Sequence, residues 1–413
     1  MVERVTIIGA GIVGICTAIS LLEKGFEVLL VDRDEPAEGA SHGNAGVISP
    51  WTCIPQSMPG MWRSIPKWLL DPEGPVALRL GYLPKFIPWA LKFLAAGNEE
   101  RLPAIADAMQ ALNRPNVDLY RQMLDGTGYE HLIVDSMYVH VFRNPASVDL
   151  KKLAWTLREE RGVPLELVGQ EQLHEIEPAL SPDFKAAVLM KGQARALDPG
   201  GVGKALAKKA KRMGAMFQRG SVRRIQPNSE GGWTLHTDGG ELEAKRVVIA
   251  AGAWSARLLA PLGYKLPLEA ERGYHLVFKD PGITVNNSIM DTDAKFVASS
   301  MEAGVRCAGT AEFAGLDVPP DYRRARVFVR LASNLFPNIN TDNRIEWMGS
   351  RPSFPDSLPC LGKIPGQEGL FCAFGHSHYG FGMAPNTGRV VAEVVAGAPP
   401  NIDMDPYRVD RFR

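Results

Sequence analysis

The feature that most constrains the fold is a glycine-rich turn near the start of the chain. The sequence VTIIGAGIVG places a short apolar strand before Gly9, Gly11 and Gly14, which have the spacing G-x-G-x-x-G. An apolar helix face follows, and then a second strand, FEVLLV, which leads into Asp32. In a strand–turn–helix unit this spacing lets backbone N–H groups meet a pyrophosphate, and an acid after the second strand binds a ribose hydroxyl. Residues 5–32 therefore predict a dinucleotide-binding fold.

The motif by itself leaves the ligand open. A G-x-G-x-x-G run also occurs in turns that bind nothing, and it does not separate FAD from NAD. Arg33, directly after the acid, would suit a 2′-phosphate, but a basic residue there is also typical of a solvated loop, and we favour the loop.

Charge and cysteine content limit the partners. The chain of 413 residues has 46 Lys plus Arg and 46 Asp plus Glu, so its formal net charge is zero and nucleic acid is not an expected partner. The five cysteines are scattered, odd in number and without C-x-x-C spacing, which favours reduced thiols and a cytoplasmic location. A chain of this length predicts two domains.

The remaining pattern predicts an α/β chain with two kinds of sheet. Helical periodicity runs from about Pro84 to Leu124, and again after Asp198 and Pro199, which suit an N-cap and a first helical position. Short strands such as GYHLVFK follow one another from about 266 to 314 with no helix between them, which is typical of an antiparallel sheet. We therefore predict a Rossmann-like dinucleotide-binding domain interleaved with an antiparallel-sheet domain.

Separated segments of the chain share motifs with one family. They are GAGIVG with Asp32, GASHGNAGVIS at 39–49, VVIAAGAWS at 247–255, GSRPSFPDSLPCLG at 349–362 and FGHSHYGFGMAPNTGR at 374–389. In this order they resemble the FAD-dependent D-amino acid oxidase superfamily, and within it the bacterial D-amino acid dehydrogenase small-subunit branch. The resemblance implies FAD, bound without a covalent link.

The resemblance also implies a division of the chain and a set of cofactor contacts. The FAD-binding domain would comprise 1–50, 148–255 and 341–413, and the substrate-binding domain 51–147 and 256–340. The glycine-rich start of the last helix would present N–H groups to the N1/C2=O edge of the flavin. The predicted FAD-binding residues are Gly9, Ala10, Gly11, Ile12, Val13, Gly14, Asp32, Arg33, Ser41, Asn44, Ala45, Gly46, Val222, Ala251, Gly252, Trp254, Gly375, His376, Gly380, Gly382 and Met383.

The substrate site is predicted around Arg351. A guanidinium binds both oxygens of a carboxylate, and Arg351 stands where family members such as glycine oxidase place their carboxylate-binding arginine. Tyr274 would offer its hydroxyl to the same carboxylate, and His376 and Tyr379 would lie beside the flavin edge. A structural salt bridge for Arg351 and simple packing for Tyr274 are the alternatives. No metal site is expected, and His378 is expected to be structural.

Other positions bear on the electron acceptor. Gly349 stands where some related oxidases carry a flavin-linking cysteine, and Cys307 aligns with the lysine that they use for reaction with oxygen. The first departure implies no covalent attachment of the flavin by that route, and the second favours a quinone or an electron-transfer protein as acceptor. The amphipathic, tryptophan-rich segment 51–97 would suit peripheral contact with the inner face of a membrane, with a cap over the substrate domain or a homo-oligomer surface as alternatives.

These expectations combine in one reaction. A hydride would pass from Cα of a D-amino acid, or of a cyclic or N-substituted one such as D-proline or hydroxyproline, to flavin N5, giving an imine and then a 2-oxo acid. A glycine- or sarcosine-type oxidase that releases hydrogen peroxide is the alternative enzyme. A flavin-binding electron-transfer subunit of a larger complex is the alternative of another class.

Overall fold

The opening motif lies inside a six-stranded sheet of the computed structural model, which describes residues 3–71 and 73–412. The sheet is parallel except for the pair β18 and β19. Such a sheet needs cover on both faces. Its strands, in spatial order, are β18 (Cys360–Lys363), β19 (Leu370–Phe374), β12 (Arg246–Ile249), β1 (Arg4–Ile8), β2 (Glu27–Asp32) and β8 (Met216–Arg219).

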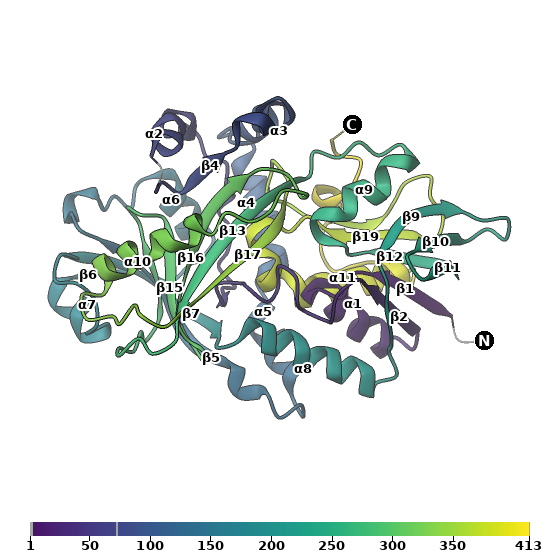
Figure 1. The fold of residues 1–413 in the computed structure, drawn as a ribbon, viewed down its shortest axis with the longest axis horizontal. Helices are drawn as coiled ribbons and strands as arrows, with labels where there is room; N and C mark the ends of the chain where they lie inside the picture. The colour runs from purple at the N-terminus through teal and green to yellow at the C-terminus, as the bar shows by residue number, and fades with distance from the viewer. Residues whose placement is uncertain (1–2, 72, 413) are drawn as a thin grey trace.

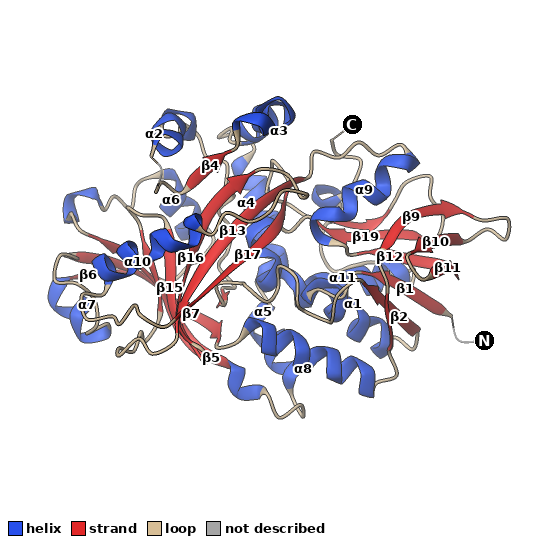
Figure 2. Cartoon of the chain, viewed as in Figure 1, coloured by secondary structure: helices blue, strands red, loops and turns tan. Residues whose placement is uncertain are grey.

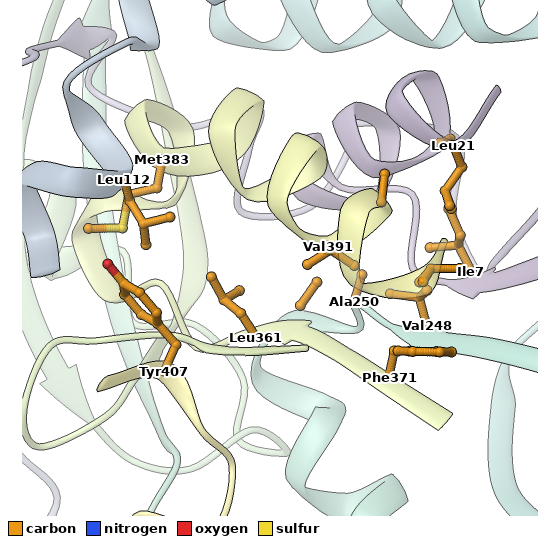
Figure 3. Packing of buried hydrophobic residues seen from close by; sticks show 14 of the residues in the cluster. Ile7, Leu21, Leu112, Val248, Ala250, Leu361, Phe371, Met383, Val391 and Tyr407 are labelled. Atoms are coloured by element: carbon orange, nitrogen blue, oxygen red, sulfur yellow. The ribbon is translucent and has the colours of Figure 1, made fainter. Parts of the chain in front are cut away.

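Helices cover one face of this sheet and a small sheet covers the other. On the helical face Ile7 of β1 packs with Leu21 and Val391, which belong to the first and last helices (Figure 3). Val5 of the same strand belongs to this cluster. On the opposite face Val247 packs with residues of a three-stranded antiparallel sheet. That small sheet contains β9 (Val222–Pro227), β10 (Trp233–Thr237) and β11 (Gly240–Ala244).

A second, ten-stranded sheet lies beside the first (Figures 1 and 2). Most of its neighbouring strands are antiparallel, and β17 lies at one edge. The path runs β17 (Arg344–Ser353), β13 (Glu269–Phe278), β16 (Gly304–Phe313), β15 (Phe296–Met301), β14 (Ser288–Asp291), β5 (Ile133–Phe142), β7 (Ala186–Ala196) and β3 (Val47–Ile48), with β4 (Val76–Leu78) on β16 and β6 (Leu165–Gly169) on β7.

The helices follow the predicted pattern, with one block divided. Asp198 precedes the lysine-rich helix as its N-cap residue, as predicted. The periodic block from Pro84 to Leu124 forms three helices, because the chain turns at Gly97 and again before Asn116. The helices are α1 (Ile12–Glu23), α2 (Ile65–Leu70), α3 (Leu83–Ala96), α4 (Leu102–Asn113), α5 (Asn116–Leu124), α6 (Leu153–Glu160), α7 (Gln170–Ile176), α8 (Pro199–Arg212), α9 (Ser255–Leu259), α10 (Arg323–Leu335) and α11 (Gly380–Val395).

The predicted fold class is confirmed, but strand pairing departs from the predicted domain ranges. Strands β6 and β7 lie in the range 148–255 assigned to the FAD-binding domain, yet they pair within the ten-stranded sheet. Strand β17 lies in the range 341–413 and also joins that sheet. A strand-forming sequence can pair in either sheet, so its partner is decided by tertiary packing rather than by local pattern.

Two further properties concern the chain as a whole. Within residues 3–71 and 73–412, no helix is both long and apolar enough to cross a bilayer. All five cysteines are unpaired and buried.

Candidate functional site

A cavity of about 1440 Å³ is bordered by both large sheets. Its lining begins at the first glycine turn, at the carboxyl ends of β1, β2 and β12, and continues across one face of the ten-stranded sheet to Arg351 on β17. A crevice at the carboxyl ends of parallel strands is where such sheets bind dinucleotides. The cavity therefore joins the predicted cofactor site to the predicted substrate site.

The first turn has the backbone geometry that the glycine motif predicts. Gly9 adopts a φ of 112°, and a Cβ on it would lie 2.3 Å from the carbonyl oxygen of Ala250 on the neighbouring chain segment. Both the conformation and the close approach exclude other residues. Asp32 accepts a hydrogen bond from the backbone N–H of Ala10 at 2.6 Å, which holds the turn against the end of β2.

The N-terminus of α1 offers unpaired donors to this end of the cavity. Ser41 Oγ accepts from the backbone N–H of Ile12 at 2.9 Å. The N–H groups of Val13 and Gly14 have no hydrogen-bond partner among the described residues. Orphan N–H groups at the positive end of a helix suit a pyrophosphate, so these residues fit the phosphates of a dinucleotide.

Arg33 is more than part of a solvated loop. Its guanidinium carbon lies 3.7 Å from the centroid of the Trp254 ring, and both residues line the cavity. Arg33 also pairs with its exposed neighbour Asp34 at 3.1 Å. The stacked arginine and tryptophan form a flat wall beside Asp32, where the adenosine half of a dinucleotide would lie.

The start of α11 forms the opposite end of the cofactor site. Tyr379, Gly380, Phe381 and Gly382 all line the cavity. Helix α11 follows directly on a 3-10 turn at Ser377–Tyr379, and its first residues form this wall of the cavity. Helix α11 has sixteen residues, and its positive end would stabilise negative charge on a bound ring.

His376 lies beside this helix start but is held by the protein. Its Nε2 is 3.0 Å from Thr387 Oγ1, and burial lowers the pKa of His376 to about 3. The ring is therefore neutral at physiological pH. Tyr379 donates its hydroxyl hydrogen to the carbonyl of Ile54 at 2.9 Å, which ties the helix start to the segment after β3.

Most of the predicted cofactor residues line the cavity, and three do not. Gly14 packs against the carbonyl of Gly9, while a Cβ on Gly46 would meet the backbone of Ala196. Met383 points into the apolar core beside Leu112 (Figure 3), so its predicted cofactor contact is wrong. Helical geometry explains the error, because Met383 follows Gly382 on the face turned toward the core. The predicted residues that do line it are Gly9, Ala10, Gly11, Ile12, Val13, Asp32, Arg33, Ser41, Asn44, Ala45, Val222, Ala251, Gly252, Trp254, Gly375, His376, Gly380 and Gly382.

Arg351 faces the cavity and is paired with a buried carboxylate. Its Nη1 donates to Glu271 Oε1 at 2.9 Å and to the carbonyl of Thr310 at 3.0 Å. Arg351 and Glu271 are direct cross-strand neighbours on β17 and β13. Nη2 makes one long contact, 3.5 Å, to the carbonyl of Gly309, and Nε has no partner among the described residues. The side-on fork of Nε and Nη2 therefore remains available to a second carboxylate.

Glu271 is the centre of a buried polar cluster that the sequence did not indicate. His378 Nε2 lies 2.9 Å from Oε1, while Gln56 Nε2 and Ser353 Oγ donate to Oε2 at 3.1 and 3.0 Å. Burial alone would raise the pKa of Glu271, but the charges of His378 and Arg351 hold it well below its ordinary value. The carboxylate is therefore ionised, and His378, expected to be structural, is part of the site.

Gly273 makes room for the Arg351 guanidinium. A Cβ built on Gly273 would lie 2.1 Å from Arg351 Cζ, so the guanidinium lies flat over this glycine on the adjacent strand. Any larger residue would displace it. The anchor thus has Glu271 and the carbonyl of Thr310 at its edge and the backbone of Gly273 beneath it.

Tyr274 does not have the predicted role. Its hydroxyl donates to Glu312 Oε2 at 2.6 Å and accepts from the backbone N–H of Asp321 at 3.0 Å. Burial, followed by the bond to Glu312, raises the pKa of Tyr274 to about 12. Arg272 reaches the same carboxylate at 3.2 Å. The tyrosine ring borders the cavity, but its hydroxyl serves a structural pair with Glu312.

Cys307 also differs from its expected position. It is fully buried in the apolar cluster on the sheet face away from the cavity, whereas its neighbours Ala308 and Gly309 line the cavity. Adjacent residues of a strand face opposite sides, so an alignment error of one residue places the wrong side chain in a site. Cys307 is therefore not beside the cofactor site and gives no indication of the electron acceptor.

Trp347 lines the cavity, although no motif of the sequence indicates it. Its ring stacks on His275, with centroids 4.9 Å apart and planes at 14°, and a Cβ on Gly43 would lie 2.1 Å from it. It thus packs the loop after β2 against the ten-stranded sheet. Within the described ranges no three His, Cys, Asp or Glu side chains are grouped as metal ligands.

The chain is similar to known proteins over nearly its whole length. The sequence model of a family described as FAD dependent oxidoreductase matches residues 4–394. A D-amino-acid oxidase from Bradyrhizobium diazoefficiens is 37% identical over 417 residues, and a D-amino acid dehydrogenase from the same organism is 32% identical over 418 residues. Each alignment covers 99% of this chain and 99% of the relative. The solved structure of glycine oxidase from Geobacillus kaustophilus has a TM-score of 0.75 and 23% identity, with 99% of both chains covered.

Proposed function

Because the chain belongs to the family of FAD dependent oxidoreductases, we propose that it oxidises a D-amino acid, or a cyclic or N-substituted amino acid, at the Cα–N bond. The single observation that carries the proposal is the cavity-facing fork of Arg351. A guanidinium held by Glu271 and Thr310 and still open at Nε and Nη2 suits a substrate carboxylate. The similarity to the D-amino-acid oxidase and the D-amino acid dehydrogenase supports the same substrate class.

The chain's residues divide the work between cofactor and substrate. FAD, when bound, supplies the hydride acceptor. The first turn and Asp32 would hold its adenosine half, and the start of α11 would place positive potential at the flavin edge. Arg351 would fix the substrate carboxylate and so the direction of the Cα–H bond. The substrate loses a hydride and a proton to become an imine, which water hydrolyses to a 2-oxo acid and ammonia.

Glu271 would act on the anchor rather than on the substrate. Its charge fixes the orientation of Arg351 and offsets part of the guanidinium charge, so substrate release need not break a full buried ion pair. His378 and Gln56 keep the carboxylate ionised and in place. Glu271, Gln56 and His378 are therefore positioning residues for Arg351.

Anaerobic reduction of the bound flavin tests the proposal. Purified holoenzyme is mixed with D-amino acids, their L-enantiomers, D-proline, hydroxyproline and sarcosine, and the flavin absorbance is followed. We expect bleaching by at least one D- or N-substituted amino acid and formation of the matching 2-oxo acid. If every member of the panel leaves the flavin oxidised, the proposal is wrong, and the flavin-binding subunit without activity of its own becomes the better account.

We propose further that the electrons pass to a quinone at an anionic membrane surface. Residues 62–94 carry a band of exposed apolar side chains, and Leu70 and Leu80 are 83% and 84% exposed. Helices α2 and α3 of this segment lie at the same edge of the molecule (Figure 1). The band comprises Trp62, Leu69, Leu70, Leu80, Leu83, Ile87, Leu91 and Leu94, with Arg63, Lys67, Lys85 and Lys92 exposed among them.

Two features favour a lipid surface over a protein partner. Exposed apolar residues interspersed with cations suit the interface of an anionic bilayer, where apolar side chains enter and lysines reach the headgroups. The same segment lines the cavity through Trp68, Phe86 and Trp89 on its inner side. A quinone leaving the bilayer under this segment would have a short path to the flavin.

Sedimentation with vesicles tests the membrane surface. The holoenzyme is expected to bind vesicles that contain anionic lipid, and Leu70→Glu with Leu80→Glu should weaken that binding at least tenfold. Phe217→Glu, at an exposed apolar residue far from the band, is the matched control. Equal binding by all three proteins, or none by the wild type, would contradict the proposal. Stoichiometric hydrogen peroxide in place of quinone reduction would favour the oxidase alternative.

A further inference from the structure

Besides the anchor Arg351, the cavity is lined by Arg158, an arginine without an acidic partner among the described residues. Arg158 on α6 lines the cavity, donates from Nη1 to the carbonyl of Ala154 at 3.0 Å, and lies 4.7 Å from the ring centroid of Trp155. No carboxylate of the described residues lies within ion-pair distance of it. Burial lowers the pKa of Arg158, yet a guanidinium stays charged at neutral pH. A half-buried charge without a counter-ion is costly unless a ligand pairs with it.

The side chains around Arg158 are polar, and one of them is unsatisfied. His140 on β5 lines the cavity and is 7% exposed, and its Nε2 is buried without a hydrogen-bond partner. Its ring makes edge contacts with Tyr138 and Trp155, at centroid distances of 4.7 and 5.2 Å. Burial lowers the pKa of His140 well below its ordinary value, so its ring is neutral. A neutral imidazole without a partner is one more donor that a bound anion can use.

A further positive charge lies at the rim of the same region. Lys295 lines the cavity, and its backbone has a left-handed conformation with a φ of 59°. Its side chain makes no ion pair within the described ranges. Its charge acts on His140, together with that of Arg158. Arg158 and Lys295 give the region around β5 and α6 positive charge, and Asp291 and Asp293, the acids whose charges act on Lys295, are paired with Arg143.

Tyr379 links this region to the substrate anchor. Tyr379, Arg158 and Glu271 all line the same cavity, and the charges of Arg158 and of Glu271 both act on the Tyr379 phenol. Arg351 is paired with that same Glu271. The cavity thus presents the Arg351 guanidinium at the anchor and the Arg158 guanidinium on α6.

We infer that Arg158, with His140 and Tyr138, forms a second anion subsite, so that the substrate is an amino acid carrying a second carboxylate on its side chain or on its nitrogen. The inference rests on the proposed function, because Arg351 must take the first carboxylate. A dicarboxylic substrate would pair with Arg351 through one carboxylate and with Arg158 through the other. A neutral substrate would leave Arg158 and His140 unpaired beside it.

The test compares acid and amide substrates of the same shape. Holoenzyme and Arg158→Gln are assayed with D-glutamate, D-aspartate and D-glutamine. We expect the wild type to favour D-glutamate or D-aspartate, and Arg158→Gln to raise the KM of that acid by about tenfold to a hundredfold while D-glutamine changes less than twofold. Arg158→Lys should retain part of the preference. Lys151→Gln, which removes a charge beside α6 but outside the cavity lining, should change neither.

Binding of an unreactive dicarboxylate gives a readout that needs no turnover. Glutarate and butyrate are titrated into the holoenzyme while the flavin spectrum is followed, and only glutarate should lose affinity in Arg158→Gln and in His140→Leu. Equal loss of affinity for glutarate and butyrate, or a changed flavin spectrum before any ligand is added, would assign Arg158 to the cofactor and overturn the inference.

The two proposals fail in different ways. If amino acids reduce the flavin irrespective of Arg158, the subsite is wrong and the proposed function stands. If glutarate binding depends on Arg158 but no amino acid reduces the flavin, the proposed function fails instead.

Discussion

Removal of the Arg351 guanidinium should weaken carboxylate binding by more than the lost contacts, because it exposes Glu271 to the substrate. The open fork of Nε and Nη2 would make two charge-assisted hydrogen bonds, and these contribute about 3 kcal/mol together. In Arg351→Ala that contribution disappears. The Glu271 carboxylate, which lies 2.9 Å from Nη1 in the wild type, then faces the substrate carboxylate directly.

The repulsion follows from the geometry of the pair. A carboxylate on the far edge of the guanidinium would lie roughly 6 Å from Glu271, which at an effective dielectric constant of 20 gives about 3 kcal/mol. His378 and Gln56 remain bonded to Glu271 and offset part of this, leaving about 1.4 kcal/mol. The sum predicts that KM rises on the order of 1000-fold in Arg351→Ala. Adding Glu271→Gln should recover about tenfold of that loss.

Steady-state kinetics with the substrate found in the flavin-reduction panel provides the measurement. Flavin content, read from absorbance, should be the same in wild type, Arg351→Ala and the double variant, since Arg351 lies away from the first turn. Arg344→Ala removes an exposed arginine from the other end of β17 and serves as the control. An unchanged KM in Arg351→Ala would remove this residue from the site. A double variant no better than the single one would refute the electrostatic account of Glu271.

Three other variants test separate parts of the structure. Gly273→Ala should raise KM about tenfold with normal flavin content, because the new Cβ would lie 2.1 Å from Arg351 Cζ. Gly81→Ala, whose Cβ would meet nothing within 4 Å, should behave as wild type. Equal KM values for the two variants would contradict the packing of Arg351 on Gly273. Glu271→Gln should change the acid dependence of stability. Because the folded-state pKa of Glu271 lies below its ordinary value of 4.5, its contribution is complete above that pH and is lost as the pH falls further. The free energy of unfolding of the wild type, measured by denaturant titration, should therefore approach that of Glu271→Gln by up to about 1.4 kcal/mol per pH unit below pH 4.5. If the free energies of unfolding of the two proteins change in parallel with pH, Glu271 is not held ionised. Asp32→Ala should weaken FAD about tenfold to a hundredfold, measured as recovery of free FAD fluorescence on dilution, and undiminished retention of FAD would show that Asp32 serves the turn alone.

The parts of the site that the sequence predicted are those encoded by contiguous residues. The first turn depends on Gly9, Gly11 and Asp32, whose spacing determines the local backbone, and α11 begins where its glycines predict. Arg351 was identified through its place in the family motif, and it faces the cavity. In each case a short segment contains the whole signal.

The parts that were missed depend on pairing between distant strands. Glu271 reads as one charged residue in a strand, and its importance follows only from lying opposite Arg351, eighty residues later. His378 and Gln56 reach the same carboxylate from two further segments. Cys307 was assigned to the site although its strand turns it away, because a shift of one residue reverses the face of a strand. The partners of Glu271 and the face on which Cys307 lies follow only from the tertiary structure.

The pairing of Arg351 with Glu271 also affects how the chain reaches its fold. Strand β17 is the edge of the ten-stranded sheet, so β13 is the strand that sets its register there. A slip by one residue would turn Arg351 to the opposite face and leave Glu271 buried without its partner. The ion pair therefore penalises misregistered pairing of two long strands whose sequence separation makes them slow to meet. Substitutions that relax the anchor should then appear first as poor yield of folded protein, before any kinetic constant is measured.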